Sequence, residues 1–499
     1  MPVFFAPAEG PTCAGLTFRV GQADETLTTR GVSHLVEHLA LHAVGQHHGP
    51  TNGAVCMLDT SFFIRAEPDD VSTFLASLTA ALGDLPLHRL AAEARILETE
   101  AAGKGPSASA ALLLYRFGPQ GYGLPAQAEL GLHQLGEDDV QRWAHERFTA
   151  ENASLWIVGT LPDDLALHLE PGVWHAPPEP ATIEPVRPGW FIDRPGVVAL
   201  DAVVRRSDAA NMALFIARQQ VEDRLRHRDA TSYSVCADID TWTCEAIRLF
   251  LAADTLPAHA SEVADGLVST LDALASEGPS QAELDRCTRE AAEAWAGPHV
   301  AGRLASGLAA DRLLRRTSRP LARYLDDLRA VTAEEVRQAV EELVDDSLLL
   351  VPPGGEPGTG RHSAVAVFSA SRIAGTELHR TTWYDEETAG NRLLVAPEGI
   401  TYLIDAERPV TVRFADAQAV QLWTDGARTV IGADGYRIFV HPLEWDRGSW
   451  AVDIIDWATP PRLAVPMGAD AGSRMLEEVA RRAPPPPPPP PRSRWSKRT

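Results

Sequence analysis

The stretch from Gly31 to Leu39 reads GVSHLVEHL and contains the pattern His-x-x-Glu-His at His34, Glu37 and His38. Residues three and four apart share a face of an α-helix, so a helix here presents both imidazoles and the carboxylate to one side. These are the groups that a zinc hydrolase needs, with the histidines as ligands and the glutamate as the acceptor of a proton from water. The alternative is an amphipathic helix whose histidines fall on one face by chance.

A catalytic zinc keeps three protein ligands, so the pattern requires a third one elsewhere in the chain. The acidic segment 90–100 has a helical pattern, in which Glu93 and Glu100 lie two turns apart on one face and Glu98 lies on another side. Either Glu93 or Glu100 could be the ligand, with the other supporting it. A solvated glutamate-rich helix face is the alternative.

The order of these motifs resembles the pitrilysin/insulinase family of zinc peptidases (M16), which includes proteins like the mitochondrial processing peptidase. The resemblance covers roughly residues 10–352. It implies that His34, His38 and Glu100 bind Zn²⁺, that Glu37 is the general base and that Glu93 supports the site. The gap of 62 residues between His38 and Glu100 is shorter than is usual in the family. Glu93 and Glu98 therefore stay open as alternatives for the third ligand. The residues that carry the resemblance are Asp24-Glu25, Gly31-x-x-His34-x-x-Glu37-His38, Asn52-Gly53, Glu93 and Glu100.

The resemblance also implies two substrate-binding elements. Asn52, Gly53 and Ala54 would lie on a sheet-edge strand beside the metal and hold an extended peptide through backbone hydrogen bonds. Arg226 and Tyr233 would face the metal, bind the substrate backbone and help to stabilise the oxyanion. The alternatives are an ordinary internal strand, and an arginine at a helix C-terminus followed by a tyrosine in a strand.

The chain contains an internal repeat. A helix-like segment around Val140 followed by SLWIV recurs around Val336 followed by SLLLV, 196 residues later. Two units with the same closing helix and strand indicate a duplication, although the second unit has no His-x-x-Glu-His. Stretches rich in Pro, or in Pro and Gly, separate the units and mark linkers.

We therefore predict an α+β fold. The repeat predicts two related α/β domains, followed by a small β-rich domain and a Pro-rich tail. The resemblance implies that each of the two domains is an antiparallel-rich sheet with helices, and that together they form half of a clamshell. Trp423, Trp445, Trp450 and Trp457 are expected to fill the core of the β-rich domain. The expected boundaries are 1–165 for the zinc-binding domain, 166–196 for a linker, 197–352 for the second domain, 353–362 for a linker, 363–470 for the β-rich domain, and 471–499 for a helix remnant and the polyproline and basic tail.

The composition limits the partners and the location. A net charge of −23, from 45 basic and 68 acidic residues, argues against nucleic acid and anionic membranes as partners. The N-terminal residues show neither a signal peptide nor a mitochondrial presequence, and no apolar run is long enough to span a membrane. The five scattered cysteines form no disulfide pattern, so a cytoplasmic location is expected.

These features predict a zinc-dependent endopeptidase that hydrolyses peptides or unfolded segments. The resemblance implies a closed chamber made by a homodimer, or by a heterodimer with a paralogue. The alternative is a catalytically inactive subunit or a peptide-binding scaffold that pairs with an active partner. The β-rich domain or the Pro-rich tail could bind a further protein partner.

Overall fold

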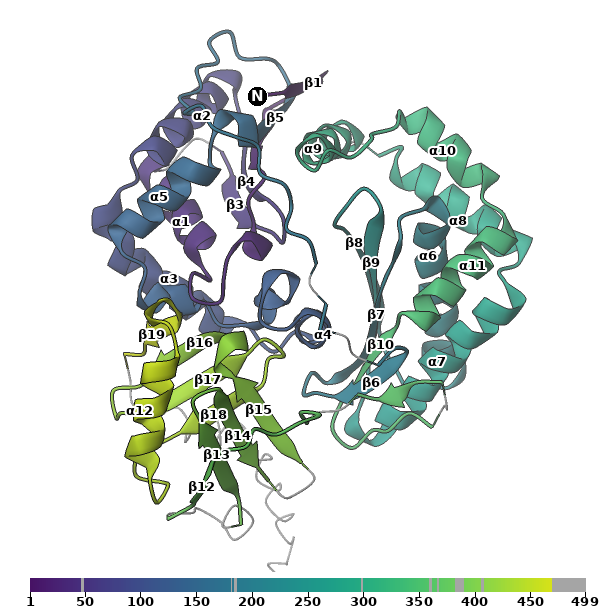
Figure 1. Ribbon diagram of the computed structural model, residues 1–499. Helices are drawn as coiled ribbons and strands as arrows, with labels where there is room; N and C mark the ends of the chain where they lie inside the picture. The colour runs from purple at the N-terminus through teal and green to yellow at the C-terminus, as the bar shows by residue number, and fades with distance from the viewer. Residues whose placement is uncertain are drawn as a thin grey trace, which may run out of the picture.

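The computed structural model has an α+β fold in three units, which we call the first unit (1–180), the second unit (186–365) and the C-terminal unit (368–468) (Figure 1). No described helix combines the length and hydropathy that crossing a membrane requires. The predicted helix remnant and polyproline tail at 471–499 lie outside the described residues. The structure describes residues 1–45, 49–180, 182–183, 186–297, 299–358, 361–365, 368–381, 390–404 and 408–468.

The first unit is built on a five-stranded sheet in the order β1-β5-β2-β4-β3. All neighbours are antiparallel except β1 and β5, which are parallel. Residues of β2, such as Leu16 and Phe18, share a buried core with α1, α2 and α5. The strands are β1 (Val3–Pro7), β2 (Thr12–Phe18), β3 (Thr51–Val55), β4 (Thr60–Ala66) and β5 (Ala153–Gly159). The helices are α1 (Val32–Val44), α2 (Pro68–Gly83), α3 (Leu90–Gly103), α4 (Ala108–Phe117) and α5 (Glu137–Arg147).

The second unit repeats this topology. Its sheet has the order β11-β6-β10-β7-β9-β8, in which β6 to β8 follow the pattern of the first sheet and β11 is added at one edge. The shared strand order confirms the predicted duplication. The strands are β6 (Gly189–Ile192), β7 (Val197–Arg205), β8 (Val235–Thr241), β9 (Ala246–Asp254), β10 (Leu348–Val351) and β11 (Ser363–Ala364). The helices are α6 (Asp208–Glu222), α7 (Ala260–Glu277), α8 (Gln281–Ala294), α9 (Val300–Leu313), α10 (Leu321–Ala330) and α11 (Ala333–Asp345).

The two units exchange helices. α4, from the first unit, packs on β7 and β10 of the second sheet, while α9, from the second unit, packs on β1, β2 and β5 of the first (Figure 1). Leu112 of α4 joins Ala199 and Leu350 in one buried cluster. Arg116 of α4 reaches the carboxylate of Asp201 in β7 at 2.9 Å. Each unit thus completes the core of the other.

The C-terminal unit holds two four-stranded sheets and one helix around its own core. The sheets have the orders β12-β13-β14-β15 and β18-β17-β16-β19. The elements are β12 (Thr376–His379), β13 (Arg392–Ala396), β14 (Gly399–Leu403), β15 (Pro409–Arg413), β16 (Ala417–Leu422), β17 (Arg428–Gly432), β18 (Arg437–Val440), α12 (Gly448–Ala458) and β19 (Ala464–Pro466).

Two of the predicted domain boundaries differ from those in the structure. β6 lies inside the segment 166–196 that was expected to be a linker, and β11, which follows residue 352, pairs with β6. The second sheet therefore extends beyond the predicted limits of 197–352. Pro188 directly precedes β6, and a proline is tolerated at the start of a strand, so a Pro-rich composition does not distinguish this strand from a linker.

The prediction of four core tryptophans is wrong for two of them. Trp445 is 3% exposed in the core, and Trp423 is partly buried at another cluster. Trp450 and Trp457, however, lie on α12, a helix that strand-like patterning did not predict, and are 36% and 74% exposed. They are seven residues apart and share the helix face opposite Ile455, which is the buried face.

Candidate metal centre

The helix that carries the His-x-x-Glu-His pattern is held at its N-terminus by a buried carboxylate. Glu25 accepts hydrogen bonds from the backbone N–H groups of Gly31 (3.0 Å) and Ser33 (2.9 Å) and from the guanidinium of Arg30 (3.0 Å). An acidic group here satisfies N–H groups that have no partner inside the helix and interacts favourably with the helix dipole. The start of α1 is therefore fixed, and with it the direction of the side chains that follow.

Two imidazoles and one carboxylate converge on one point between α1 and α3. The Nε2 atoms of His34 and His38 each lie 3.9 Å from Oε2 of Glu100. One donor atom from each of the three residues falls within 4.8 Å of the others, and no second group of this kind occurs among the described residues. The three donors are thus close enough to hold a small cation if their side chains move slightly towards one another.

A further carboxylate lies beside the Nδ1 atom of each histidine. Nδ1 of His34 lies 3.1 Å from Oε1 of Glu129, and Nδ1 of His38 lies 3.4 Å from Oε2 of Glu93. A carboxylate at Nδ1 accepts the proton there, so the other ring nitrogen, Nε2, is left with a lone pair facing Glu100. The arrangement is that of an imidazole prepared to ligate through Nε2.

The three alternatives for the third ligand occupy different places. Glu100 faces both Nε2 atoms, whereas Glu93 is 4% exposed and lies behind His38. Glu98 is turned away from this group and lies 3.6 Å from Nδ1 of His133. The second oxygen of Glu100 is bound by Lys104 at 2.7 Å, which orients Oε2 towards the histidines.

Glu129 is the site residue that sequence reasoning missed. It lies 95 residues after His34, in a segment of short turns, and no spacing rule connects it to α1. Its close approach is possible because Gly31 has no side chain: a Cβ there would lie 2.9 Å from Cβ of Glu129. Gly31 also has a φ of +101°, which other residues rarely adopt.

The charges of the site shift several pKa values. Burial lowers the pKa of His34, but the hydrogen bond and charge of Glu129, together with the charges of Glu37 and Glu100, outweigh it, so the net pKa is raised. Burial raises the pKa of Glu129, but the hydrogen bond with His34 and the charges of Arg30, His34 and Lys104 lower it by more, so this carboxylate stays ionised. The hydrogen bond from Lys104 lowers the pKa of Glu100. Both carboxylates that would face or support a cation are therefore held in their charged form.

Glu37 lies between the two histidines and is 5% exposed. Its Oε2 is 3.9 Å from Nε2 of His34 and 3.7 Å from Nε2 of His38. Burial raises the pKa of Glu37, although the two histidines oppose the shift. A buried carboxylate with a raised pKa beside the candidate ligands is suited to accept and return a proton.

The strand that would receive substrate lies at the edge of the first sheet, next to Glu37. β3 pairs with β4 on one side, and Asn52 and Ala54 are exposed on it. A Cβ at Gly53 would lie 2.7 Å from Cδ and 2.8 Å from Cγ of Glu37. The backbone of β3 therefore approaches the carboxylate so closely that a larger residue at this position would have to displace the Glu37 side chain.

Among the described contacts, Arg226 and Tyr233 do not touch the candidate metal centre of their own chain. Arg226 lies in the irregular helical turn Asp223–Arg228 at the end of α6, and its guanidinium is 5.0 Å from the ring centroid of Tyr233. Its other described contact is Glu222, at 3.4 Å. Tyr233 precedes β8 rather than lying in a strand, and it is 75% exposed. The pair thus forms a separate exposed feature of the second unit.

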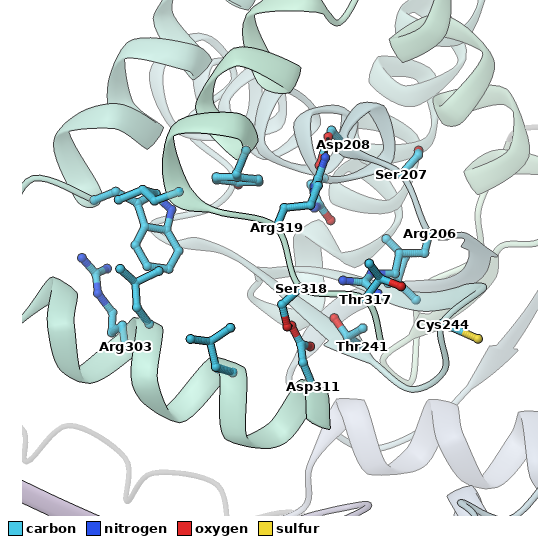
Figure 2. A pocket seen from close by; sticks show the side chains of 18 residues that line it. Arg206, Ser207, Asp208, Thr241, Cys244, Arg303, Asp311, Thr317, Ser318 and Arg319 are labelled. Atoms are coloured by element: carbon cyan, nitrogen blue, oxygen red, sulfur yellow. Dashed lines mark hydrogen bonds and ion pairs between the residues drawn. The ribbon is translucent and has the colours of Figure 1, made fainter. Parts of the chain in front are cut away.

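A cavity of about 510 Å³ also lies in the second unit, between the start of α6, α9 and the segment before α10 (Figure 2). Two of its charged lining residues pair with each other, since Arg319 binds Asp208 at 2.8 Å, and a third, Asp311, is bound by Arg316 at 2.8 Å. None of the predicted site residues lines this cavity. The cavity is therefore distinct from the group formed by His34, His38 and Glu100.

Several solved structures are similar to this chain. The peptidase M16 inactive domain from Pseudomonas fluorescens gives a TM-score of 0.57 at 17% identity, over 72% of this chain and 96% of that one. A protease from Helicobacter pylori gives 0.59 at 17% identity, over 70% and 96%. A putative M16-like peptidase from Alicyclobacillus acidocaldarius gives 0.56 at 13% identity, over 70% and 95%. No protein-family model and no curated protein matches the chain.

Over about 70% of its length, the chain has the M16 peptidase fold. This agrees with the predicted pair of related α/β domains followed by a β-rich region. One of the similar M16 structures is an inactive domain, so the fold alone does not establish catalysis. The chemistry of this chain has to be argued from the residues that it places together.

The ligand set can be tested by metal content. We expect His34→Ala and Glu100→Gln to lower the affinity for Zn²⁺ by more than about 100-fold, beyond the loss typical of a supporting carboxylate. Zinc retained after gel filtration would be measured by elemental analysis. Glu98→Gln, on the same helix, is the matched control and should retain the metal. Equal zinc content in Glu100→Gln and Glu98→Gln would contradict this ligand set.

Proposed function

We propose that this protein is a zinc-dependent endopeptidase that cleaves peptides or unfolded segments. The observation that carries the proposal is the convergence of His34, His38 and Glu100 within 4.8 Å, with the Glu37 carboxylate beside both Nε2 atoms. Two neutral imidazoles and a carboxylate form a donor set that suits Zn²⁺ and leaves a position open for water or substrate.

In this proposal the protein supplies the ligands, the base and their orientation. Zinc, when bound, would lower the pKa of a coordinated water and polarise the scissile carbonyl. Glu37 accepts a proton from the attacking water and then passes it to the leaving amine. Glu129 and Glu93 hold the two imidazoles through Nδ1 and keep Nε2 available.

We propose that the substrate binds as an additional strand on β3. An extended peptide beside Asn52, Gly53 and Ala54 would pair with the free backbone groups of this edge. Because Gly53 lies against Glu37, pairing there would bring a peptide bond close to the base. Backbone pairing depends on extended shape rather than sequence, which favours unfolded or short substrates over folded proteins.

We also propose that Arg226 and Tyr233 act on a site in a second chain. Within the described part of one chain the pair touches none of the metal-centre residues, and Tyr233 is exposed. A homodimer, or a heterodimer with a paralogue, would bring the pair of one chain to the metal centre of the other and enclose the chamber. There the cation and the phenol would stabilise the developing oxyanion.

Other aspects of the proposal rest on less specific features. The five cysteines are unpaired, which is consistent with a reducing compartment such as the cytoplasm. A protein partner for the C-terminal unit remains a proposal. An inactive subunit or peptide-binding scaffold is the alternative function, since one protein with this fold is an inactive domain.

Replacing the proposed base separates catalysis from metal binding. Glu37→Gln should retain zinc and lower the cleavage rate by about 10²–10⁴-fold, because the amide cannot accept the proton. Cleavage of a quenched peptide library and zinc content would be measured on the same samples. Cleavage at the wild-type rate would refute the mechanism. A wild-type chain that binds zinc and peptides but cleaves nothing would favour the scaffold.

The contact between β3 and the base gives a second test. Gly53→Ala should lower cleavage by about 100-fold, within the range of a lost general base, because the new Cβ must displace the buried Glu37 side chain. Zinc content should stay unchanged. Gly83→Ala is the matched control, since a Cβ there meets no atom within 4 Å. Unchanged kinetics in Gly53→Ala would show that the approach of β3 has no role in catalysis.

Complementation tests whether two chains share the site. Glu37→Gln and Arg226→Ala chains would be co-expressed, each being impaired when alone. Half of the random dimers combine both chains and contain one intact site, so about a quarter of the wild-type activity should return. Activity that stays at the average of the two single variants would mean that chains do not share the site.

A further inference from the structure

The residue that orients His34 lies in a segment with little regular structure of its own. Glu129 lies between two 3₁₀ turns, Gly121–Ala126 and Leu130–His133, which we call together the 121–133 segment. Short 3₁₀ turns have few internal hydrogen bonds, so neighbouring elements determine where such a segment lies. The position of the Glu129 carboxylate therefore depends on what packs around this segment.

One set of contacts comes from the first unit. The backbone N–H of Gly131 donates to the carbonyl of Arg30 at 3.0 Å, and the guanidinium of Arg30 lies 3.6 Å from Glu129. Just after the segment, the Gln134 amide donates to the carbonyl of Thr28 at 2.7 Å. These contacts anchor the side of the segment that faces α1.

The other set comes from the C-terminal unit. Leu124 and Leu130 share a buried cluster with side chains of β16, β17 and the end of the C-terminal unit, which we call the junction cluster. Arg437 of β18 also donates a hydrogen bond to Gln127, which is 6% exposed. Contacts between β19 and the turn Leu130–His133 complete this side. The junction cluster consists of Leu27, Leu124, Leu130, Ala419, Ile431, Val465 and Met467.

Glu129 and Leu130 are adjacent in the chain and connect the two sets of contacts. The carboxylate of Glu129 lies 3.1 Å from Nδ1 of His34, while the side chain of Leu130 is 3% exposed inside the junction cluster. A shift of the backbone at Leu130 would also move Glu129, because the two residues are joined by one planar peptide unit.

We propose that the C-terminal unit is a positioning element of the metal centre: by packing on Leu124 and Leu130 it holds Glu129 against His34. Glu129 is a positioning residue, since it acts on the metal through the imidazole. The inference rests on the proposed function only in that the centre binds zinc. A protein partner that loosened the junction cluster would weaken metal binding from a distance.

Strand β17 offers a matched pair of variants. Ile431 and Val430 are neighbours on this strand and are both fully buried, but they point to opposite faces. Ile431 belongs to the junction cluster, and Val430 belongs to the core of the C-terminal unit itself. Ile431→Ala therefore opens a cavity at the junction, whereas Val430→Ala opens one inside the unit.

The experiment measures the dissociation constant for Zn²⁺ in the full-length chain by competition with a chromophoric chelator. Glu129→Gln should weaken binding by about 10–100-fold, as is typical when a carboxylate that is hydrogen-bonded to a metal ligand is lost. Ile431→Ala should weaken it by about tenfold, the lower end of that range, while Val430→Ala should leave it unchanged. Thermal unfolding of both alanine variants would show that each destabilises the protein.

A double variant tests whether Ile431 affects zinc binding through Glu129. If Ile431 acts through Glu129, adding Ile431→Ala to Glu129→Gln should change zinc affinity by less than about twofold. Equal affinities of Ile431→Ala and Val430→Ala, with normal zinc binding by the wild type, would overturn this inference and leave the proposed function intact. A wild-type chain that takes up no zinc would overturn both.

Discussion

A buried carboxylate, Asp201, joins the two halves of the molecule. It accepts hydrogen bonds from Arg116 at 2.9 Å and from Arg248 at 2.7 Å, and all three side chains are at most 1% exposed. Burial alone would raise the pKa of Asp201, but the two guanidiniums lower it, so the group stays ionised. Breaking a buried ion pair typically costs about 3–5 kcal/mol. Because Arg116 belongs to α4, this cluster holds the exchanged helix on the second sheet.

The helix exchange has a consequence for the site. α9 covers the β1, β5 and β2 part of one face of the first sheet, while α1 and α2 pack on the other face (Figure 1). Its edge at β3 is left open beside Glu37. The exchanged helix thus covers the side of the sheet away from β3, and an extended chain can add at the β3 edge, next to the residues that could bind a metal.

Local rules accounted for the parts of the site that lie within one element. The helical period places His34, Glu37 and His38 together, and the same period correctly set Glu98 apart from Glu93 and Glu100. Local rules failed where the structure depends on contacts between residues that are far apart in the sequence. α12 was missed because its tryptophans suggested a β core, and β6 was missed because prolines precede it.

The sequence by itself determined that two imidazoles and a carboxylate share one helix face, that the α/β unit occurs twice, and that only the first copy carries this pattern. The tertiary structure alone decided which glutamate faces both Nε2 atoms, and it brought Glu129 to His34 from 95 residues away. It also placed Arg226 and Tyr233 apart from the candidate metal centre of their own chain. The physical reason is that helical periodicity acts over a few residues, whereas these positions depend on how separate helices and turns pack together.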